Sequence, residues 1–413
     1  MSGHNDPGVA RHPRRGTPAL TEQRLRRFGI HPLRPRDAAE PHRTASALEL
    51  LFDLVFVVAV SFAASTLHEL EQDGRAGQGT LSYLIVFAAI WWAWMTFTWF
   101  ATAFDTDDWL YRVATLVQMG GALVIAAGVV PAMTEGDITL LVVGYLVMRL
   151  VAIPQWLRVA VQNPEYRVTA LRYAAGIAVV QSCWLLLLGL GATSVGTWVV
   201  LPVLALEFAV PPFAERARPT PWHPHHVAER FGLFTLILLG ESILASATAI
   251  IAALGDTEHL AGLIVVAISG LIVVAAMWWV YFARPMHTRL SNGLGRAMVF
   301  GYFHYVIFAA AGAVSAGIEV AVGTLEHGAH ADPLMLRCTL VVPVAAFFLG
   351  VWWLALRPTL RARSNVLIVA LCAIMGTSAF FEASVIELAV CAAAIVVVVE
   401  RGNTQPPESA PER

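Results

Sequence analysis

Long apolar runs, separated by short polar loops, fill most of the chain between two polar tails. Only helices and closed barrels cross a bilayer, because every backbone polar group needs a partner inside hydrocarbon. A spanning helix needs roughly 20 apolar residues, and these runs have about that length. They predict an all-α, polytopic membrane protein with about 12 spans, or about 10 or 11 if the shortest runs do not cross. The candidate spans are residues 46–67, 80–103, 110–130, 138–159, 170–190, 195–212, 229–253, 259–282, 296–320, 336–356, 365–381 and 383–400.

The composition agrees with a lipid environment. Hydrophobic residues make up 57% of the chain and charged residues 14%, whereas a typical soluble domain has about 25% charged residues. The net charge of −2 argues against a nucleic-acid partner. The chain contains no lysine, and its Ala, Val, Leu and Arg usage favours a bacterial source. No nucleotide-binding or zinc-protease motif is present, so we expect no cofactor, no metal and no enzymatic activity.

The arginines are distributed unevenly between the loops. If the N-terminus is cytoplasmic, most of the 27 arginines lie in cytoplasmic loops and tails, whereas the opposite loops carry Arg75 and Arg337. Positively charged loops remain on the cytoplasmic side of a membrane. We therefore expect a bacterial inner-membrane protein with an even number of spans and both termini in the cytoplasm. The basic tail 1–45 and the tail 401–413 are expected to lack fixed structure.

The chain also repeats itself weakly. Segment 49–56 is similar to 229–236, and segment 112–128 is similar to 296–312. Because six is an even number, two six-helix halves would have the same orientation, as parallel repeats do. Two membrane halves and a cytoplasmic linker are expected, over residues 46–212, 229–400 and 213–228 respectively.

Three ionisable side chains and one glutamine lie inside the expected spans, where polar groups are costly and commonly functional. Glu241 lies about 18 Å from the cytoplasmic end of its span, near the middle of a core about 30 Å thick. Arg149 lies at a similar depth, His304 about 12 Å deep, and Gln118 shallower. We expect Glu241 and Arg149 to pair at a substrate or ion site, with His304 as a proton relay. The alternative is a structural ion pair beside a packed histidine.

Polar residues also gather at the start of each half. Ser46 and Glu49 fit a capping box, and Asp53 lies one turn deeper on the same helix face. The corresponding residues of the second half are His226, Glu229 and Arg230. We expect Asp53 to bind substrate or an ion, and the others to form a cytoplasmic gate or cation site. A His–Glu pair three residues apart also fits a metal site, but a single pair is too few ligands to predict one.

An acidic run, Asp105, Asp107 and Asp108, lies in a loop on the expected cytoplasmic side. It belongs to the same candidate gate or cation site. The alternatives are that it pairs with neighbouring arginines, or that Asp107 or Asp108 caps the next helix.

Several motifs that contain polar residues occur in order along the chain. They are ELLFDLVFV from Glu49, FTWFATAFDTDD from Phe97, RVATLVQM from Arg112, YLVMR from Tyr145, HVAERFGLFTLILLGES from His226, GYFH from Gly301 and GIE from Gly317. This set resembles the bacterial low temperature requirement A (LtrA) family over about residues 40–400. The resemblance implies a membrane-embedded protein and does not imply a particular biochemical activity. Residues 283–285, Ala-Arg-Pro, depart from the family pattern, which has an acidic residue there.

Three functions fit these observations. The first is a secondary transporter, with proton coupling as one version of it, that moves an unknown small solute or ion between two halves around a charged midplane site. The second is a cation channel built from two six-helix units, because FDLVFVVAV from Phe52 resembles the first-helix motif of lysosomal-type potassium channels, although the motif's serine is absent. The third is a membrane stress-response protein without transport activity.

Overall fold

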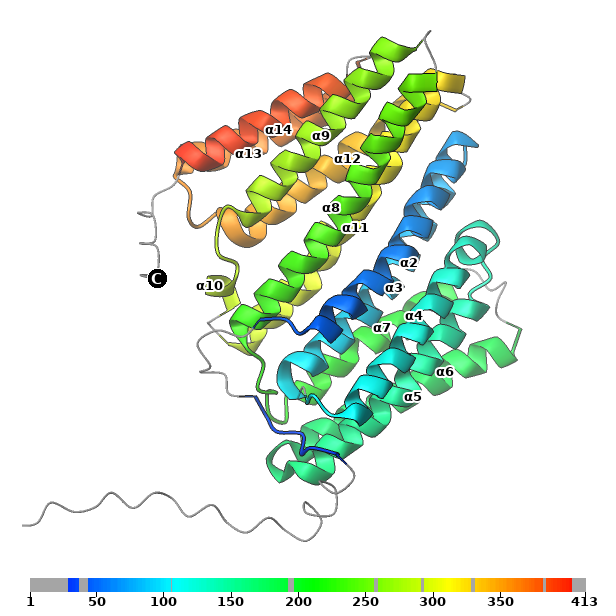
Figure 1. Cartoon of the computed structure of the whole chain (residues 1–413), viewed down its shortest axis with the longest axis vertical. Helices are drawn as coiled ribbons and strands as arrows, with labels where there is room; N and C mark the ends of the chain where they lie inside the picture. Colours follow the sequence, from blue (N-terminus) through cyan, green and yellow to red (C-terminus); the bar gives the residue numbers. More distant parts are fainter. Residues whose placement is uncertain are drawn as a thin grey trace, which may run out of the picture.

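The structure is a computed structural model that describes residues 29–36, 44–104, 106–191, 197–255, 259–290, 293–327, 331–381 and 384–402. The regular elements in these ranges are helices, and no strand occurs among them (Figure 1). The first group comprises α2 (Ala47–Gln72), α3 (Ala76–Phe104), α4 (Trp109–Thr134), α5 (Thr139–Gln162), η1 (Pro164–Tyr166), α6 (Arg167–Gly189) and α7 (Thr197–Glu215). The second comprises α8 (Pro224–Gly255), α9 (Leu260–Phe282), α10 (His287–Leu290), α11 (Leu294–His327), α12 (Pro333–Val351), η3 (Trp352–Leu356), α13 (Ala362–Ser378) and α14 (Ser384–Arg401).

The helices confirm an all-α membrane protein. Each of the twelve predicted runs falls on a helix, and nine helical segments among the described residues are long and apolar enough to cross a membrane. The other three, α7, α13 and α14, have 19, 17 and 18 residues. The chain is therefore a multi-pass membrane protein, while the number of twelve crossings stays a prediction.

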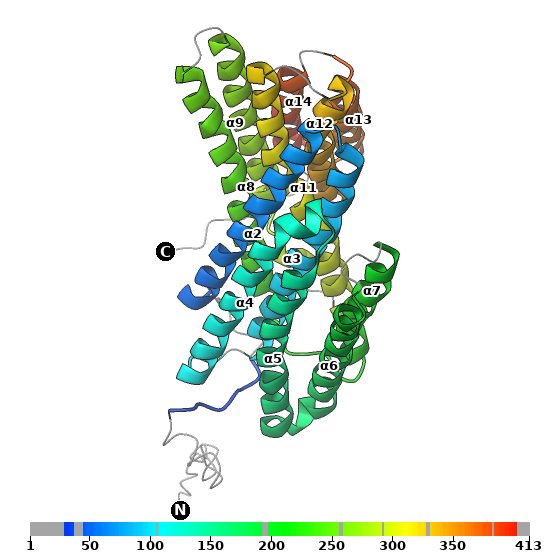
Figure 2. The same ribbon diagram turned by 90° about the vertical axis from the view of Figure 1, so that its right-hand side faces the viewer.

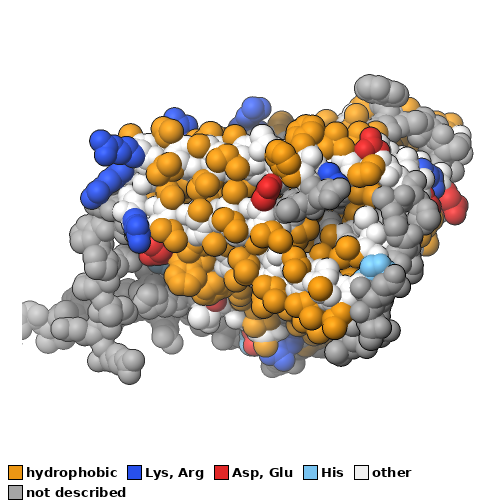
Figure 3. Space-filling view, turned by 90° about the horizontal axis from the view of Figure 1, so that it is seen from above, with side chains coloured by type: hydrophobic (Ala, Val, Ile, Leu, Met, Phe, Trp, Pro, Cys, Tyr) orange, Lys and Arg blue, Asp and Glu red, His pale blue; other side chains and the backbone are white. Residues whose placement is uncertain are grey.

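The outer surface of the bundle is apolar. Leu54, Leu150 and Val390 are each more than half exposed, at 55%, 59% and 63%. Figure 3 shows hydrophobic side chains over most of one face, with the arginines mainly toward its edges. A soluble monomer rarely exposes so large an apolar surface, whereas lipid would cover it.

Helices α2 and α8 begin at the same end of the bundle and run in parallel. Arg230, near the start of α8, contacts Glu49, near the start of α2, and Ser61 contacts Glu241 three turns farther along. Arg158, at the end of α5, also lies at this end, where it contacts Asp108. We call it the arginine-rich end, and the opposite end of the bundle the far end.

Equivalent neighbours pack together in the two groups of helices. Helix α4 packs on α5 as α11 packs on α12, and α2 packs on both α3 and α4 as α8 packs on both α9 and α11. Close helix approach is allowed by glycine: a Cβ on Gly144 would lie 2.6 Å from the Gly121 carbonyl oxygen, and one on Gly317 would lie 2.5 Å from Leu340 Cα. The two groups meet where α2 and α3 pack against α8 and α11.

The two groups differ at one helix pair. Helices α9 and α14 pack closely, whereas over their described residues the backbones of α3 and α7 lie farther apart and large side chains bridge them. In Figure 2, α6 and α7 lie to one side of the bundle, beyond α3 and α5. The far halves of α3 and α7 therefore leave room between them, and a cavity occupies that space.

Part of the N-terminal tail is ordered against the bundle, which differs from the expectation for residues 1–45. Leu33 is buried, its backbone N–H donates to Gln162 at 2.7 Å, and its carbonyl oxygen accepts from Asn163 at 2.9 Å. Because α5 ends at Gln162, this tail segment covers the arginine-rich end of that helix. Residues 1–28, 37–43 and 403–413 lie outside the described residues.

Candidate functional site

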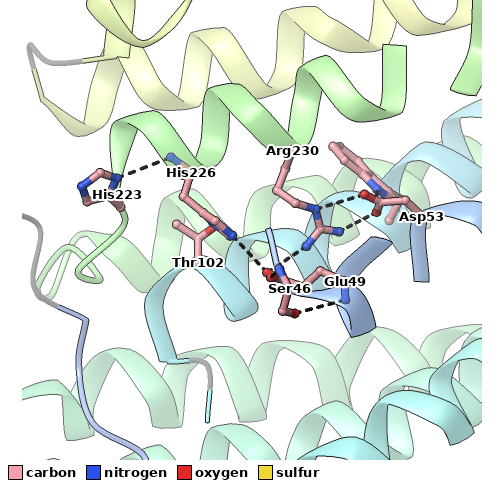
Figure 4. A network of polar contacts seen from close by, with 8 residues as sticks. Ser46, Glu49, Asp53, Thr102, His223, His226 and Arg230 are labelled. Atoms are coloured by element: carbon pink, nitrogen blue, oxygen red, sulfur yellow. Dashed lines mark hydrogen bonds and ion pairs between the residues drawn. The ribbon is translucent and has the colours of Figure 1, made fainter. Parts of the chain in front are cut away.

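Four ionisable side chains join the start of α2 to the start of α8 (Figure 4). Glu49 and Asp53 come from α2, and His226 and Arg230 come from α8; we call this set the α2–α8 clamp. Arg230 contacts both carboxylates, with Nη1 3.0 Å from Glu49 Oε1 and Nη2 2.5 Å from Asp53 Oδ1. Its Nε donates to Asp53 Oδ2 at 3.1 Å, which makes this pairing bidentate.

Helix α3 completes the clamp with two neutral partners. Trp94 Nε1 donates to Asp53 Oδ1 at 2.6 Å, and Thr102 Oγ1 lies 2.9 Å from His226 Nδ1. His226 Nε2 lies 3.1 Å from Glu49 Oε1. All four clamp residues are buried, at no more than 1% exposed. Two carboxylates and one guanidinium carry a net charge of −1, so protonation of His226 would bring the clamp to neutrality.

The clamp brings together part of the predicted gate. The capping box is confirmed, because Glu49 Oε2 accepts from the Ser46 backbone N–H at 2.7 Å while Ser46 Oγ accepts from the Glu49 backbone N–H at 3.3 Å. Glu229 does not join the clamp and instead lines a separate pocket beside His225 and His287. Among the described residues, no group of three or more His, Cys, Asp or Glu side chains could hold a metal ion.

The expected Glu241–Arg149 pair is wrong. Arg149 Nη2 donates to Glu207 Oε1 on α7 at 2.8 Å, and its Nη1 donates to Thr96 Oγ1 at 2.7 Å. Glu241 accepts a hydrogen bond from Ser61 Oγ at 2.7 Å instead. The predicted α7 ended at residue 212, but the helix continues to Glu215, and this places Glu207 well inside it.

The Arg149–Glu207 pair is buried at mid-depth. Arg149 is 3% exposed and Glu207 is 4% exposed. Each lies ten residues from the start of its helix, which corresponds to about 15 Å at 1.5 Å per residue. Arg149 Nε and Glu207 Oε2 have no hydrogen-bond partner. A buried polar atom of this kind is rare, and ligand or water binding is one reason for it.

His304 is packed among aromatic rings, away from Arg149 and Glu241. Its Nδ1 lies 2.8 Å from the Phe300 carbonyl oxygen, and its Nε2 lies 3.0 Å from the Tyr281 hydroxyl. A carbonyl oxygen can only accept, so Nδ1 carries a proton and Nε2 can accept from Tyr281. Both ring nitrogens are thus satisfied inside the second group of helices, as the packed-histidine alternative described.

Two cavities lie on either side of the Arg149–Glu207 pair. The larger, which we call the large cavity, has a volume of about 610 Å³ and extends from Gly77 and Gly136 at the far end to Tyr145 and Glu207. The smaller, which we call the small cavity, has a volume of about 40 Å³. Glu207 lines both cavities, whereas Arg149 lines the small one only. Gln118 and Arg149 both line the small cavity, and their role in a binding site stays a prediction.

An aromatic layer closes the small cavity toward the arginine-rich end. The rings of Trp156 and Tyr173 stack with centroids 4.0 Å apart, and Phe100 meets Trp156 edge-on at 5.0 Å. The Tyr173 hydroxyl and Trp99 Nε1 donate to the buried Glu215 carboxylate at 2.8 and 2.9 Å. These side chains therefore lie between the small cavity and the arginine-rich end.

The acidic run has structural partners. Asp108 caps α4, because its Oδ1 accepts from the Tyr111 backbone N–H at 2.7 Å, and its Oδ2 accepts from Arg158 Nη2 at 2.5 Å. The exposed Asp107 accepts from Arg112 at 2.8 Å, and this contact lowers the pKa of the Asp107 carboxyl. Both alternatives, a cap and arginine pairing, are thus present. Asp105 lies outside the described residues.

Arg230→Met tests whether the clamp holds α2 to α8. The change leaves two buried carboxylates without their cation, and an unpaired buried charge costs roughly 3–5 kcal/mol. We expect a large drop in the apparent melting temperature of the purified protein. Arg112→Met is the matched control, because it removes an exposed pair and should change the melting temperature little. Equal melting temperatures for the two variants would contradict the assignment.

A double-mutant cycle tests the Arg149–Glu207 pair. Arg149→Met and Glu207→Gln should each lower the melting temperature, because each leaves the partner's charge buried and unpaired. The double variant should regain most of the loss, since it buries no lone charge. The same cycle with Glu241→Gln in place of Glu207→Gln should be additive. Additive losses in the Arg149–Glu207 cycle, or coupling in the Glu241 cycle, would contradict the pairing.

Comparisons with known proteins agree with the fold. The family model described as "Bacterial low temperature requirement A protein (LtrA)" matches residues 44–399. An uncharacterized protein of Rhizobium meliloti (strain 1021) is 29% identical over 253 residues, which cover 58% of each of the two chains. The chain thus spans less than two thirds of that relative's length. The family match includes both the α2–α8 clamp and the Arg149–Glu207 pair, and it shows that the chain belongs to the bacterial low temperature requirement A (LtrA) family.

Proposed function

We propose that this protein is a secondary transporter of the bacterial inner membrane, with both termini in the cytoplasm and no catalytic step. The observation that carries the proposal is a buried ion pair, Arg149–Glu207, at the inner limit of a large cavity that reaches the far end. The cavity is closed toward the arginine-rich end by the aromatic layer. A binding site reached from one side and closed on the other is what alternating access requires.

The proposed architecture is two parallel six-helix halves. Support comes from the matching helix pairs of the two groups and from α2 and α8, which begin at one end. Because α2 and α8 begin at the same end, the chain must cross an even number of times from the start of α2 to the start of α8. With α2 as the first crossing, α7 then counts as the sixth crossing of the first half. The proposed binding site lies inside the first half, and this replaces the expected site between the halves around Glu241.

Movement of α7 toward α3 would close the large cavity. The support is the second group, where α14 already packs closely on α9, the equivalent of α3. In this proposal the first half is the more open form of an arrangement that is more tightly packed in the second half, where the corresponding cavity has a volume of about 280 Å³. This makes α7 the element whose position would decide from which side the ion pair is reached.

Proton coupling would act at His226 in place of His304. The His226 ring faces Glu49 on α2 and Thr102 on α3, and its backbone N–H donates to His223 Nδ1 just before α8. Arg230 and Asp53 lie beside it in the clamp. A protonated His226 gives a neutral clamp, and loss of the proton leaves a net charge of −1 without solvent. The contact between α2 and α8 should therefore be more stable at acidic pH than at alkaline pH.

A channel is the second candidate, and the closed aromatic layer argues against it in this conformation. A channel needs one continuous path when it opens, so both ends of the path would become accessible together. A transporter exposes them in turn. The third possibility, a stress-response protein without transport, would not require any residue of the path to change its accessibility.

Thiol labelling separates these cases. In a variant without native cysteines, Ser82→Cys places a thiol on the large cavity and Gln155→Cys places one on the small cavity. We expect an impermeant methanethiosulfonate to modify the thiol of Ser82→Cys from the far side. The thiol of Gln155→Cys should react from the arginine-rich side, and only in conditions in which Ser82→Cys is protected. Comparison of acidic and alkaline pH provides those conditions, and Gly77→Cys at the cavity mouth is the control for sidedness.

Simultaneous modification of both positions would support a channel. Transport would be contradicted if Ser82→Cys were modified at the same rate in all conditions while Gln155→Cys stayed protected from both sides.

A further inference from the structure

We infer that the large cavity binds an amphipathic organic cation, whose charge meets Glu207 and whose apolar body fills the space between α3 and α7. This inference rests on the proposed function and names the class of its substrate. The cavity volume of about 610 Å³ lies within the range of ordinary small-molecule sites, roughly 300–1,000 Å³.

The charge of the cavity favours a cation. Apart from Tyr145, the ionisable side chains that line it are two carboxylates, Glu135 at the mouth and Glu207 at the inner limit. Arg75 lies near the mouth but not on the lining, and its guanidinium donates to Gln78 and to the Thr134 carbonyl oxygen. A ligand that moves inward therefore meets negative charge at both ends of the cavity.

Glu207, which lines the large cavity, has an unused acceptor. Its Oε1 accepts from Arg149, while its Oε2 has no partner although the side chain is only 4% exposed. A ligand cation beside Oε2 would supply the missing partner. Arg149 and the ligand would then bind the same carboxylate. Because Arg149 is on α5 and Glu207 is on α7, ligand binding would be linked to the packing of α5 on α7.

An anion fits this site poorly. Arg149 is reached from the small cavity, whose volume of about 40 Å³ holds only a few waters at about 10–15 Å³ each. Its two Nη atoms already donate to Glu207 and Thr96. An anionic ligand in the large cavity would instead approach the Glu207 carboxylate, which repels it.

The apolar lining of the large cavity favours a ligand with a large apolar part. The walls include Leu81, Ile85, Val86, Leu141, Trp184 and Leu204. Two aromatic residues, Tyr145 and Trp184, also line the cavity, and cation–π contacts are worth most where water is excluded. A small hydrated ion would leave these walls uncovered, whereas a cation with bulky apolar groups would fill them.

Binding of tetraphenylphosphonium to the full chain in nanodiscs tests the inference. Tetraphenylborate is the matched probe, since it has nearly the same shape and the opposite charge. After subtraction of binding to empty nanodiscs, we expect saturable binding of tetraphenylphosphonium that tetraphenylborate does not displace. Glu207→Gln should weaken binding at least tenfold, whereas Glu319→Gln, which removes a carboxylate that contacts His68 elsewhere, should leave it unchanged.

A second variant keeps the test decisive if Glu207→Gln does not fold. Leu204→Trp fills the large cavity from α7 without removing either charge, so it should also weaken binding at least tenfold while Arg149 and Glu207 remain paired. Equal or tighter binding of tetraphenylborate, an affinity within twofold of wild type for folded Glu207→Gln, or unchanged binding in Leu204→Trp would overturn the inference.

The binding test is independent of the transport proposal. Saturable, Glu207-dependent binding without any change in thiol accessibility would uphold the cation site and contradict the transporter. Alternating accessibility without tetraphenylphosphonium binding would uphold the transporter and contradict this substrate class.

Discussion

Charge buried inside an apolar bundle is the constraint on which this structure depends. An ionised side chain in hydrocarbon is stable only beside a partner, so the positions of the charged residues decide which helices must stay together. Arg230 holds Asp53 and Glu49, and thereby ties the start of α8 to the start of α2. Arg149 holds Glu207, and thereby ties α5 to α7 at mid-depth. The first contact joins the two groups of helices, and the second lies at the inner limit of the large cavity.

The two groups of helices share a packing plan but differ in how it is completed. Helix α14 packs closely on α9, and the second group keeps a cavity of about 280 Å³ between α9, α11, α12 and α14, whereas α7 stands off from α3 and leaves the large cavity of about 610 Å³. Three contacts attach α2 and α3 to the second group. The clamp holds α2, the Tyr305 hydroxyl donates to the Leu84 carbonyl oxygen, and the Tyr83 hydroxyl donates to the Ala309 carbonyl oxygen. These contacts join α2, α3, α8 and α11. Helix α7 is joined to α11 at mid-depth, where the Tyr302 hydroxyl donates to the Phe208 carbonyl oxygen at 2.6 Å.

Much of the fold follows from local sequence, but the partners in the site do not. Run length and hydropathy placed a helix at each of the twelve predicted positions, and the Ser46–Glu49 capping box was correct because it depends on residues three apart. Depth along a helix placed Arg149 and Glu241 at similar levels, yet depth says nothing about the rotation of a helix or its neighbours. Glu207 lies in the predicted span 195–212 but was not among the predicted site residues, because the extent of α7 beyond Pro211 and Pro212 was not visible in the pattern. Thr96, Trp94 and Thr102 have no charge that would have marked them.

The most direct test of the central claim is the distance between α3 and α7, measured by pulsed electron paramagnetic resonance with spin labels at Leu81 and Leu201. Both side chains are exposed near the far end, and Ile264 on α9 with Val390 on α14 provides the matched pair in the second group. The account predicts two populated distances for Leu81–Leu201, with proportions that change between acidic and alkaline pH, and one unchanged distance for Ile264–Val390. A single, unchanged distance for Leu81–Leu201 in both conditions would contradict it.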